Sequence, residues 1–179
     1  TELTLTPETV KFGQTAALVA GGGDGDGAYT VEIIEGGTGA ATLNGATLTP
    51  TAVGTVKVRV TRAAGGNYKA ASREFTIPIT KGSAPALTIG NFSYRYTKDG
   101  RKVESLPTGM PADAGTVSWS FEVVSDPNGI ISGGSVSLGT DGRFVFDIAA
   151  GKAAGSAATI KATAASDNYA SAEVTFTVT

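Results

Sequence analysis

The residues of this chain that could carry chemistry are carboxylates, hydroxyls and a few aromatic and basic side chains, because the sequence contains neither histidine nor cysteine. This absence excludes a Ser-His-Asp or Cys-His nucleophile system and a zinc site with the usual nitrogen and sulfur ligands. It also excludes disulfides, which is compatible with many bacterial proteins and argues against a small secreted animal domain. We therefore expect neither an enzyme nor a cofactor.

One acidic segment has part of the spacing of a calcium loop. Asp24, Asp26 and Glu35 occupy positions one, three and twelve of that frame. The frame requires a ligand and a glycine where this sequence has Ala28 and Tyr29. A flexible turn is the expected structure, and Asp24 and Asp26 are the metal-ligand candidates that remain.

Four further carboxylates could in principle supply the acid and base of a glycoside hydrolase: Glu104, Asp113, Glu122 and Asp126. Asp113 also begins an Asp-Ala-Gly-Thr run that is similar to the Asp-Thr-Gly of aspartic proteases, whose chemistry needs two carboxylates. The sequence has no second copy of that run. The Leu106–Met110 segment (LPTGM) lacks the spacer residue of a sortase signal and lies in mid-chain. We interpret all of these as turn and strand residues.

The segment NFSYRYTKDGRK concentrates aromatic and basic residues, with Phe92, Tyr94 and Tyr96 alternating along it. Alternating rings are more often core than surface, and the basic side chains would then project into solvent. If the rings were exposed, Tyr94, Tyr96 and Arg95 would form a ligand-binding surface for a sugar or a protein.

The elements that position these residues are short β-strands, since apolar and polar residues alternate with a period of two in many segments. Asn44-Gly45 between such segments predicts a type I′ hairpin with both residues at positive φ. Pro78 cannot donate to a ladder, so its strand lies at an edge or is unpaired there. A change of alternation phase predicts a bulge or turn at Gly90-Asn91.

Two segments have nearly the same sequence at a constant offset of 101 residues: residues 66–77 and residues 167–178. The offset pairs Phe75 with Phe176, which we expect on the inner faces of equivalent last strands in equivalent surroundings. It also pairs Tyr68 with Tyr169, whose rings we expect to fold over the ends of the cores. The chain is therefore interpreted as two copies of one β module.

Length and composition agree with two small domains. The 179 residues include 25 glycines and only 17 % charged residues, and turn signals recur every eight to twelve residues. We expect an all-β fold of two tandem antiparallel β-sandwiches, with domains at residues 1–81 and 86–179 and a short linker at 82–85. The first residue is Thr1, from which we expect a piece of a longer precursor with flanking domains.

The charge and hydropathy patterns exclude several classes of partner. The formal net charge of −2 is spread evenly over the two halves, so neither half has the basic excess of a nucleic-acid or anionic-lipid binder. No run of eighteen apolar residues is present, so direct membrane insertion is not expected.

The run GGTGAATLNGATLTPTAVGTVKVRVTRAAGGNYKAASREFTIPITKG resembles the immunoglobulin-like repeats of bacterial cell-surface proteins, of the Gram-positive and gut-bacterial type. The second half is similar to a related repeat through LPTGMPADAGTVSW and SDNYASAEVTFTVT, and departs from it at NFSYRYTKDGRKVESL and SDPNGIISGG. The resemblance implies Ig-like sandwiches in which Trp119 falls on a strand that commonly buries a large aromatic residue. The family has no shared catalytic residues.

What the resemblance implies for function is a structural or adhesive module of a secreted or wall-attached bacterial protein that spaces or presents other domains. Its partner would be an unknown protein or glycan at the cell surface. The alternative is a carbohydrate-binding accessory module of a polysaccharide-acting protein that uses the aromatic residues of the second half. A hydrolase is the third interpretation.

Overall fold

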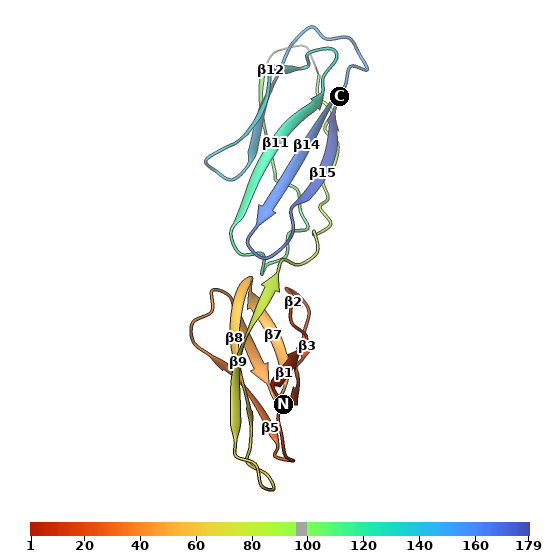
Figure 1. Cartoon of the computed structure of the whole chain (residues 1–179). Helices are drawn as coiled ribbons and strands as arrows, with labels where there is room; N and C mark the ends of the chain where they lie inside the picture. Colours follow the sequence, from red (N-terminus) through yellow and green to blue (C-terminus); the bar gives the residue numbers. More distant parts are fainter. Residues whose placement is uncertain (96–99) are drawn as a thin grey trace. The chain divides into compact units, whose positions relative to one another are not determined.

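The computed structural model describes residues 1–95 and 100–179, and every regular element in this part of the chain is a β-strand. The strands form two compact units, Thr1–Ser83 and Ala84–Thr179 (Figure 1). No helix among the described residues has the length and hydropathy needed to span a membrane. The expected all-β fold is confirmed.

The first unit contains nine strands: β1 (Leu3–Thr6), β2 (Val10–Lys11), β3 (Ala16–Ala17), β4 (Val19–Gly22), β5 (Tyr29–Ile34), β6 (Ala40–Asn44), β7 (Thr47–Ala52), β8 (Gly54–Arg62) and β9 (Ala71–Thr80). One sheet has the order β2-β9-β8-β5. Facing it, β3 pairs with β7 and β6, and β4 pairs with β1. Only Leu18 separates β3 from β4, so they form one broken strand that joins these two ladders into a single layer.

The core of the first unit lies between these layers. Along β8, Val56, Val58 and Val60 are buried, and the residues between them point outward. Other buried residues come from both layers: Leu3, Leu5, Val10, Phe12, Leu18, Leu48, Ile77 and Ile79. The period-two pattern of the sequence therefore produces the inner faces of a β-sandwich.

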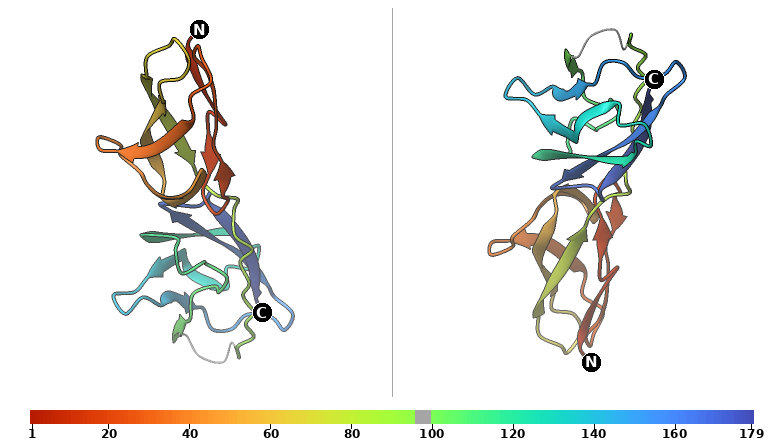
Figure 2. Two further views of the ribbon diagram at one scale, coloured as in Figure 1. Left: turned by 90° about the horizontal axis from the view of Figure 1, so that it is seen from below. Right: turned by 90° about the horizontal axis from the view of Figure 1, so that it is seen from above.

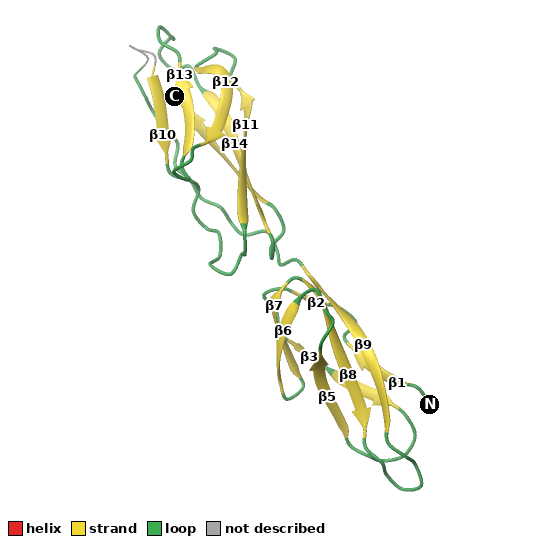
Figure 3. Ribbon diagram, turned by 90° about the vertical axis from the view of Figure 1, so that its left-hand side faces the viewer, coloured by secondary structure: helices red, strands yellow, loops and turns green. Residues whose placement is uncertain are grey.

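In the second unit, residues 84–95 and 100–179 contain six strands: β10 (Gly100–Glu104), β11 (Val117–Ser125), β12 (Ile131–Leu138), β13 (Phe144–Ile148), β14 (Ala158–Ser166) and β15 (Ala172–Val178). One sheet has the order β10-β13-β12 (Figure 3) and the other β11-β14-β15 (Figure 1). The alternation over residues 143–148 predicts Phe144, Phe146 and Ile148 inward and Arg143, Val145 and Asp147 outward. The structure agrees except at Val145, which is only 8 % exposed, so its outward prediction is wrong. The Phe144 ring lies 5.1 Å from that of Phe121, centroid to centroid.

The two units have the same strand plan. In each unit, the second-to-last strand pairs with the last strand on one side and with the strand before the hairpin on the other (β5-β8-β9 and β11-β14-β15). The hairpin pairs with one earlier strand in the opposite sheet (β3-β7-β6 and β10-β13-β12). This is the strand arrangement of constant-type immunoglobulin sandwiches. The chain is thus composed of two Ig-like antiparallel β-sandwiches, and the strands of each can be followed in Figure 2.

The beginning of the second unit changes sheets where a phase change was expected. Thr88 forms an antiparallel bridge with Thr108, which follows β10, whereas Phe92 forms a parallel bridge with Val178 at the end of β15. Between them, the Asn91 side chain accepts a hydrogen bond from the Thr177 amide at 2.8 Å. Asn91 thus satisfies a strand-edge donor at the crossing point.

The hairpin of β6 and β7 forms, but the expected turn type is wrong. Asn44 pairs with Thr47, so the two loop residues are Gly45 and Ala46 rather than Asn44 and Gly45. Only Gly45 has a positive φ, at 60°. One positive φ at the first loop position is the geometry of a type II′ turn, in which glycine is preferred at that place.

Pro78 lies at an unpaired part of a strand edge, as the sequence predicts. On its inner side β9 pairs with β8 along its whole length, and on its outer side it pairs with β2 only at Ile79 and Thr80. The outer edge of β9 before Ile79 is therefore open, so the missing amide of Pro78 removes no ladder bond there.

The paired phenylalanines hold the same position in their strands but have different surroundings. Phe176 is 2 % exposed and has the rings of Phe92 and Phe144 within 5.6 Å. Phe75 is half-buried, and the guanidinium of Arg73 lies 5.1 Å from its ring centre. The expectation of equivalent surroundings is wrong, because Phe176 is packed against aromatic rings whereas a guanidinium lies against the ring of Phe75.

Candidate binding surfaces

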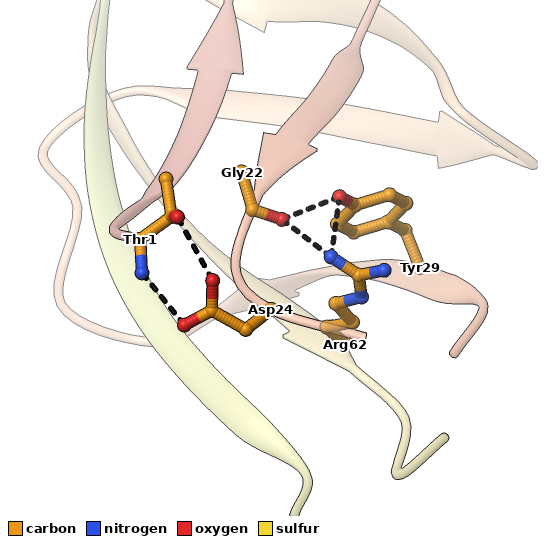
Figure 4. Close-up of polar contacts among 5 residues, drawn as sticks. All are labelled: Thr1, Gly22, Asp24, Tyr29 and Arg62. Carbon is orange, nitrogen blue, oxygen red and sulfur yellow. Dashed lines mark hydrogen bonds and ion pairs between the residues drawn. The ribbon is translucent and has the colours of Figure 1, made fainter. Parts of the chain in front are cut away.

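The glycine-rich loop after β4 places Asp24 beside the start of the chain (Figure 4). Its Oδ2 lies 2.8 Å from the amino nitrogen of Thr1, and its Oδ1 accepts a hydrogen bond from the Thr1 hydroxyl at 2.9 Å. The Thr1 side chain therefore occupies one oxygen of the Asp24 carboxylate.

The calcium-loop frame does not close in this structure. Glu35 follows β5, whose six residues extend about 20 Å at the rise of a strand and so separate it from the loop that holds Asp24 and Asp26. Among residues 1–95 and 100–179, no group of three or more acidic, histidine or cysteine side chains is arranged to hold a metal ion.

A cation and a ring support the same loop. The Arg62 Nη1 donates to the Gly22 carbonyl at 2.9 Å, and its guanidinium carbon lies 5.2 Å from the centre of the Tyr29 ring. The Tyr29 hydroxyl also donates to the Gly22 carbonyl (Figure 4). These contacts fix the backbone at the end of β4 to strands β5 and β8.

The Asn-Tyr loops, which the repeat pairs, differ between the units. In the second unit the Tyr169 hydroxyl donates to Asp113 at 2.9 Å, and Asn168 is buried with its Nδ2 donating to the Asp113 carbonyl. Burial, followed by this hydrogen bond, raises the pKa of Tyr169. In the first unit Tyr68 is 54 % exposed. The expectation that both rings cover a core is therefore wrong for Tyr68.

Backbone packing holds the Tyr68 loop outward. A Cβ on Gly65 would lie 2.2 Å from the Asp26 Oδ1 and 2.6 Å from the Gly27 amide nitrogen. The loop after β8 thus lies directly on the loop before β5, and no side chain fits between them. Tyr68 and Gly65 exchange two backbone hydrogen bonds across the tip of this loop.

Tyr94 belongs to the core of the second unit. Its ring is parallel to that of Phe92 within 7° and lies edge-on to Phe146 at 6.0 Å. The Tyr94 hydroxyl donates to Glu104, and burial followed by this bond raises the pKa of Tyr94. The interpretation of this ring as core therefore agrees with the structure better than that of an open stacking platform.

Arg95 is exposed beside Tyr94, and Tyr96 lies outside the described residues. Tyr94 and Arg95 line a hollow of about 530 Å³ together with Lys152 from the loop after β13. The ammonium of Lys102 lies 4.8 Å from the centre of the Tyr94 ring. Within the described part of the chain, three cationic residues therefore lie around the hollow and this ring: Arg95, Lys102 and Lys152.

The carboxylates that the sequence suggested as catalytic pairs all have structural partners. Glu104 accepts from Tyr94, Asp113 from Tyr169, and Glu122 lies 2.9 Å from the ammonium of Lys161. Asp126 accepts the amides of Ile130 and Ile131 with its two oxygens, at 2.8 and 2.9 Å. Trp119 packs against the core of the second unit, as the resemblance implied.

An ion-pair pattern shared by the two units was not found from the sequence. On the outer face of the first unit, Arg59 of β8 lies 3.2 Å from Glu32 and 2.9 Å from Glu74. On the second, Lys161 of β14 lies 2.9 Å from Glu122 and 3.8 Å from Glu173. The hydrogen bond to Glu74 raises the pKa of Arg59, and the one to Glu122 raises that of Lys161.

The signal for this pattern was present in two alignments. Glu32 and Glu122 occupy the same place in their gap-free strand alignment, and so do Arg59 and Lys161. The sheet order places these strands side by side, which turns one shared glutamate and one shared positive charge into a cross-strand cluster.

No protein-family model matches this sequence, and no curated protein matches it. Similar solved structures include Drosophila N-cadherin EC1-3, with 14 % sequence identity over 98 % of this chain and 66 % of that one, at a TM-score of 0.35. The I-band fragment I67-I69 of titin has 13 % identity over 99 % of this chain and 65 % of that one (TM-score 0.39). The Clostridium thermocellum CbhA fibronectin(III)-like modules have 13 % identity over 99 % and 93 % (TM-score 0.32). The chain spans just under two thirds of the length of the first two.

Proposed function

We propose that this chain is a non-catalytic structural module of a secreted or surface-attached bacterial protein, which spaces or presents other domains of that protein. The observation that carries the proposal is that each unit closes its own apolar core. Its outer sheet face is covered by a carboxylate–cation–carboxylate cluster. Such a unit keeps its shape without a partner and offers solvent a polar face.

The carboxylates also support a non-catalytic role. A general acid and a general base need a reacting group within hydrogen-bond reach of both. Here Glu104, Asp113, Glu122 and Asp126 are occupied by a tyrosine, a second tyrosine, a lysine and two backbone amides. The bacterial setting and the surface location rest on the sequence resemblance and belong to the proposal.

The location is tested on intact cells of the source organism with an antibody raised against this chain. We expect labelling without permeabilisation, and we expect added protease to remove the labelled protein while a cytosolic marker stays intact. Labelling that requires lysis of the cells would contradict the proposal.

A second candidate function is a carbohydrate-binding accessory module. The hollow lined by Tyr94, Arg95 and Lys152 favours it, because two cations beside a ring suit a sugar that carries carboxylate or sulfate groups. A glycan array tests it, with a chain in which Arg95 and Lys152 are both replaced by alanine as the matched control. Binding of acidic glycans by the wild type and not by the control would support this second function, and equal signals from both chains would contradict it.

A further inference from the structure

The first unit has a groove beside the open edge of β9. It has a volume of about 530 Å³ and lies between the segment from β1 to β2 and the outer edge of β9. Its lining residues are mostly apolar or small: Leu3, Thr4, Leu5, Pro7, Glu8, Thr9, Arg73, Phe75, Thr76, Ile77 and Pro78. The half-buried ring of Phe75 contributes to its wall.

The second unit shows what fills the equivalent place. There Phe92 bridges Val178, which the 101-residue offset pairs with Ile77. The ring of Phe92 packs edge-on against Phe176, with 5.6 Å between the ring centres and 81° between the planes. Phe176 is the counterpart of Phe75. A phenylalanine on a strand parallel to the last strand therefore closes this side of the second core.

The registers identify the residue that replaces Phe92 in the first unit. Val10 of β2 pairs with Ile79, and Glu8, in the bend two residues before β2, lines the groove together with Ile77. The sequences agree with this assignment, since LTLTPETVKF at residues 3–12 aligns without a gap with LTIGNFSYRY at residues 87–96 and pairs Glu8 with Phe92. Glu8 is exposed and does not fill the place of the ring.

The charges around the groove also affect which peptide can bind there. Arg73 already has partners, since its Nη1 lies 3.1 Å from Glu2 and donates to the Leu3 carbonyl at 2.9 Å. Glu8 forms no ion pair with any other residue in the described part of the chain, so the rim carries one uncompensated negative charge. This charge favours a cation on whatever enters the groove.

We propose that this groove is a docking site for an extended peptide segment that inserts a phenylalanine or tyrosine ring beside Phe75 and presents a basic residue to Glu8. The ring takes the place that Phe92 holds in the second unit. Burying an aromatic ring against Phe75 and Ile77 supplies the apolar part of the binding. The guanidinium of Arg73, which also lines the groove, would contribute a cation–π contact to a second ring of the peptide. This inference goes beyond the spacer role, which stands or falls independently of it.

The chain itself supplies a peptide for the test. A capped peptide of residues 89–95, IGNFSYR, contains the phenylalanine that fills the equivalent place and a basic residue. It is titrated into the ¹⁵N-labelled full chain. We expect the amide shifts that move to cluster at residues 3–9 and 73–78. The same peptide with its phenylalanine replaced by alanine should bind at least about tenfold more weakly, since the ring accounts for about 1.5–3 kcal/mol of burial.

A variant that fills its own groove completes the test. Glu8→Phe should bring the chain's own ring into the groove, raise the thermal midpoint of the first unit and abolish peptide binding. Glu8→Gln, which removes the charge without filling the space, should keep binding and reduce its salt dependence. The proposal is overturned if shifts appear elsewhere or not at all in the wild type, or if a folded Glu8→Phe chain binds the peptide as well as the wild type. The shift map of the wild type decides the question even if Glu8→Phe does not fold.

Discussion

Single polar side chains determine the conformation of several loops in this protein, and Asp126 is the clearest case. Both oxygens of its carboxylate accept backbone amides, so it holds the turn that leads from β11 into β12. The acceptors are needed because the Ile130 and Ile131 side chains are buried and their amides have little access to water.

We predict that Asp126→Ala lowers the free energy of unfolding by about 1–3 kcal/mol, the cost of leaving such donors without acceptors. Urea unfolding measures the loss. Asp147→Ala is the matched control, because Asp147 is an exposed carboxylate on neighbouring β13, and its removal should change stability by less than about 0.5 kcal/mol. Equal effects of the two substitutions would show that the two amide bonds contribute nothing special.

The phenol of Tyr94 gives the second unit a pH dependence in the alkaline range. Its pKa is raised above the ordinary value of 10.0, first by burial and then by the hydrogen bond to Glu104. A raised folded-state pKa means that the neutral phenol is favoured by folding. This contribution is fully present below the unfolded-state pKa and is lost as the pH rises towards the folded-state value.

We predict that Tyr94→Phe flattens the fall in unfolding free energy between about pH 10 and pH 12, although it loses about 1 kcal/mol at neutral pH with the hydrogen bond. Chemical unfolding at a series of pH values measures both effects. Tyr169→Phe serves as a comparison, because the pKa of Tyr169 is raised by the same two causes, burial and a hydrogen bond to a carboxylate. A wild type and a Tyr94→Phe chain with parallel pH profiles would contradict the assignment.

At the scale of elements, the hairpin of β6 and β7 shows how one residue selects a turn. Gly45 has a φ of 60°, and no atom lies within 4 Å of the place where a Cβ would be. A side chain at this position would therefore meet only backbone strain and no steric clash. This separates the conformational effect of glycine from its packing effect.

We predict that Gly45→Ala lowers the free energy of unfolding by about 1 kcal/mol, because alanine adopts positive φ at a cost of that size. Gly90→Ala is the control, since Gly90 has equally open space and no positive φ. Thermal unfolding of the three chains measures the difference. The turn assignment fails if the Gly45 and Gly90 variants are equally stable.

At the scale of the whole molecule, the chain is two units that each carry a complete set of buried strands. The core of the second unit is centred on Phe144, which is fully buried among the residues of β13, β14 and β15. None of the residues of that core cluster belongs to the first unit. Each unit should therefore unfold as a separate cooperative system.

We predict two calorimetric transitions for the full chain. Phe144→Ala should destabilise the second unit by about 3–5 kcal/mol through the cavity it leaves, and should not move the transition of the first. The separately expressed segments 1–83 and 84–179 identify which transition belongs to which unit. A single transition that shifts as a whole would show that the two cores are energetically one.

The sequence by itself determined the strand periodicity, the repeat and the all-β sandwich fold, because alternation of apolar and polar residues follows directly from the geometry of a strand. Alternation placed Phe144, Phe146 and Ile148 on the inner face, and its change of phase predicted a bulge or turn at Gly90-Asn91, where the structure has a change of bridge partner. These features depend on neighbours in sequence, so a linear pattern is enough to reveal them.

Only the tertiary structure decided what lies beside each residue across the sheets. Several features depend on which strands become neighbours and in which register. They are the different packing around Phe75 and Phe176, the exposure of Tyr68, and the ion pairs of Arg59 and Lys161. The groove lies beside the part of β9 that β2 leaves unpaired before Ile79, and its lining includes Glu8, which aligns in sequence with Phe92 of the other unit. Register is a relation between distant segments, and for that reason no local pattern contained it.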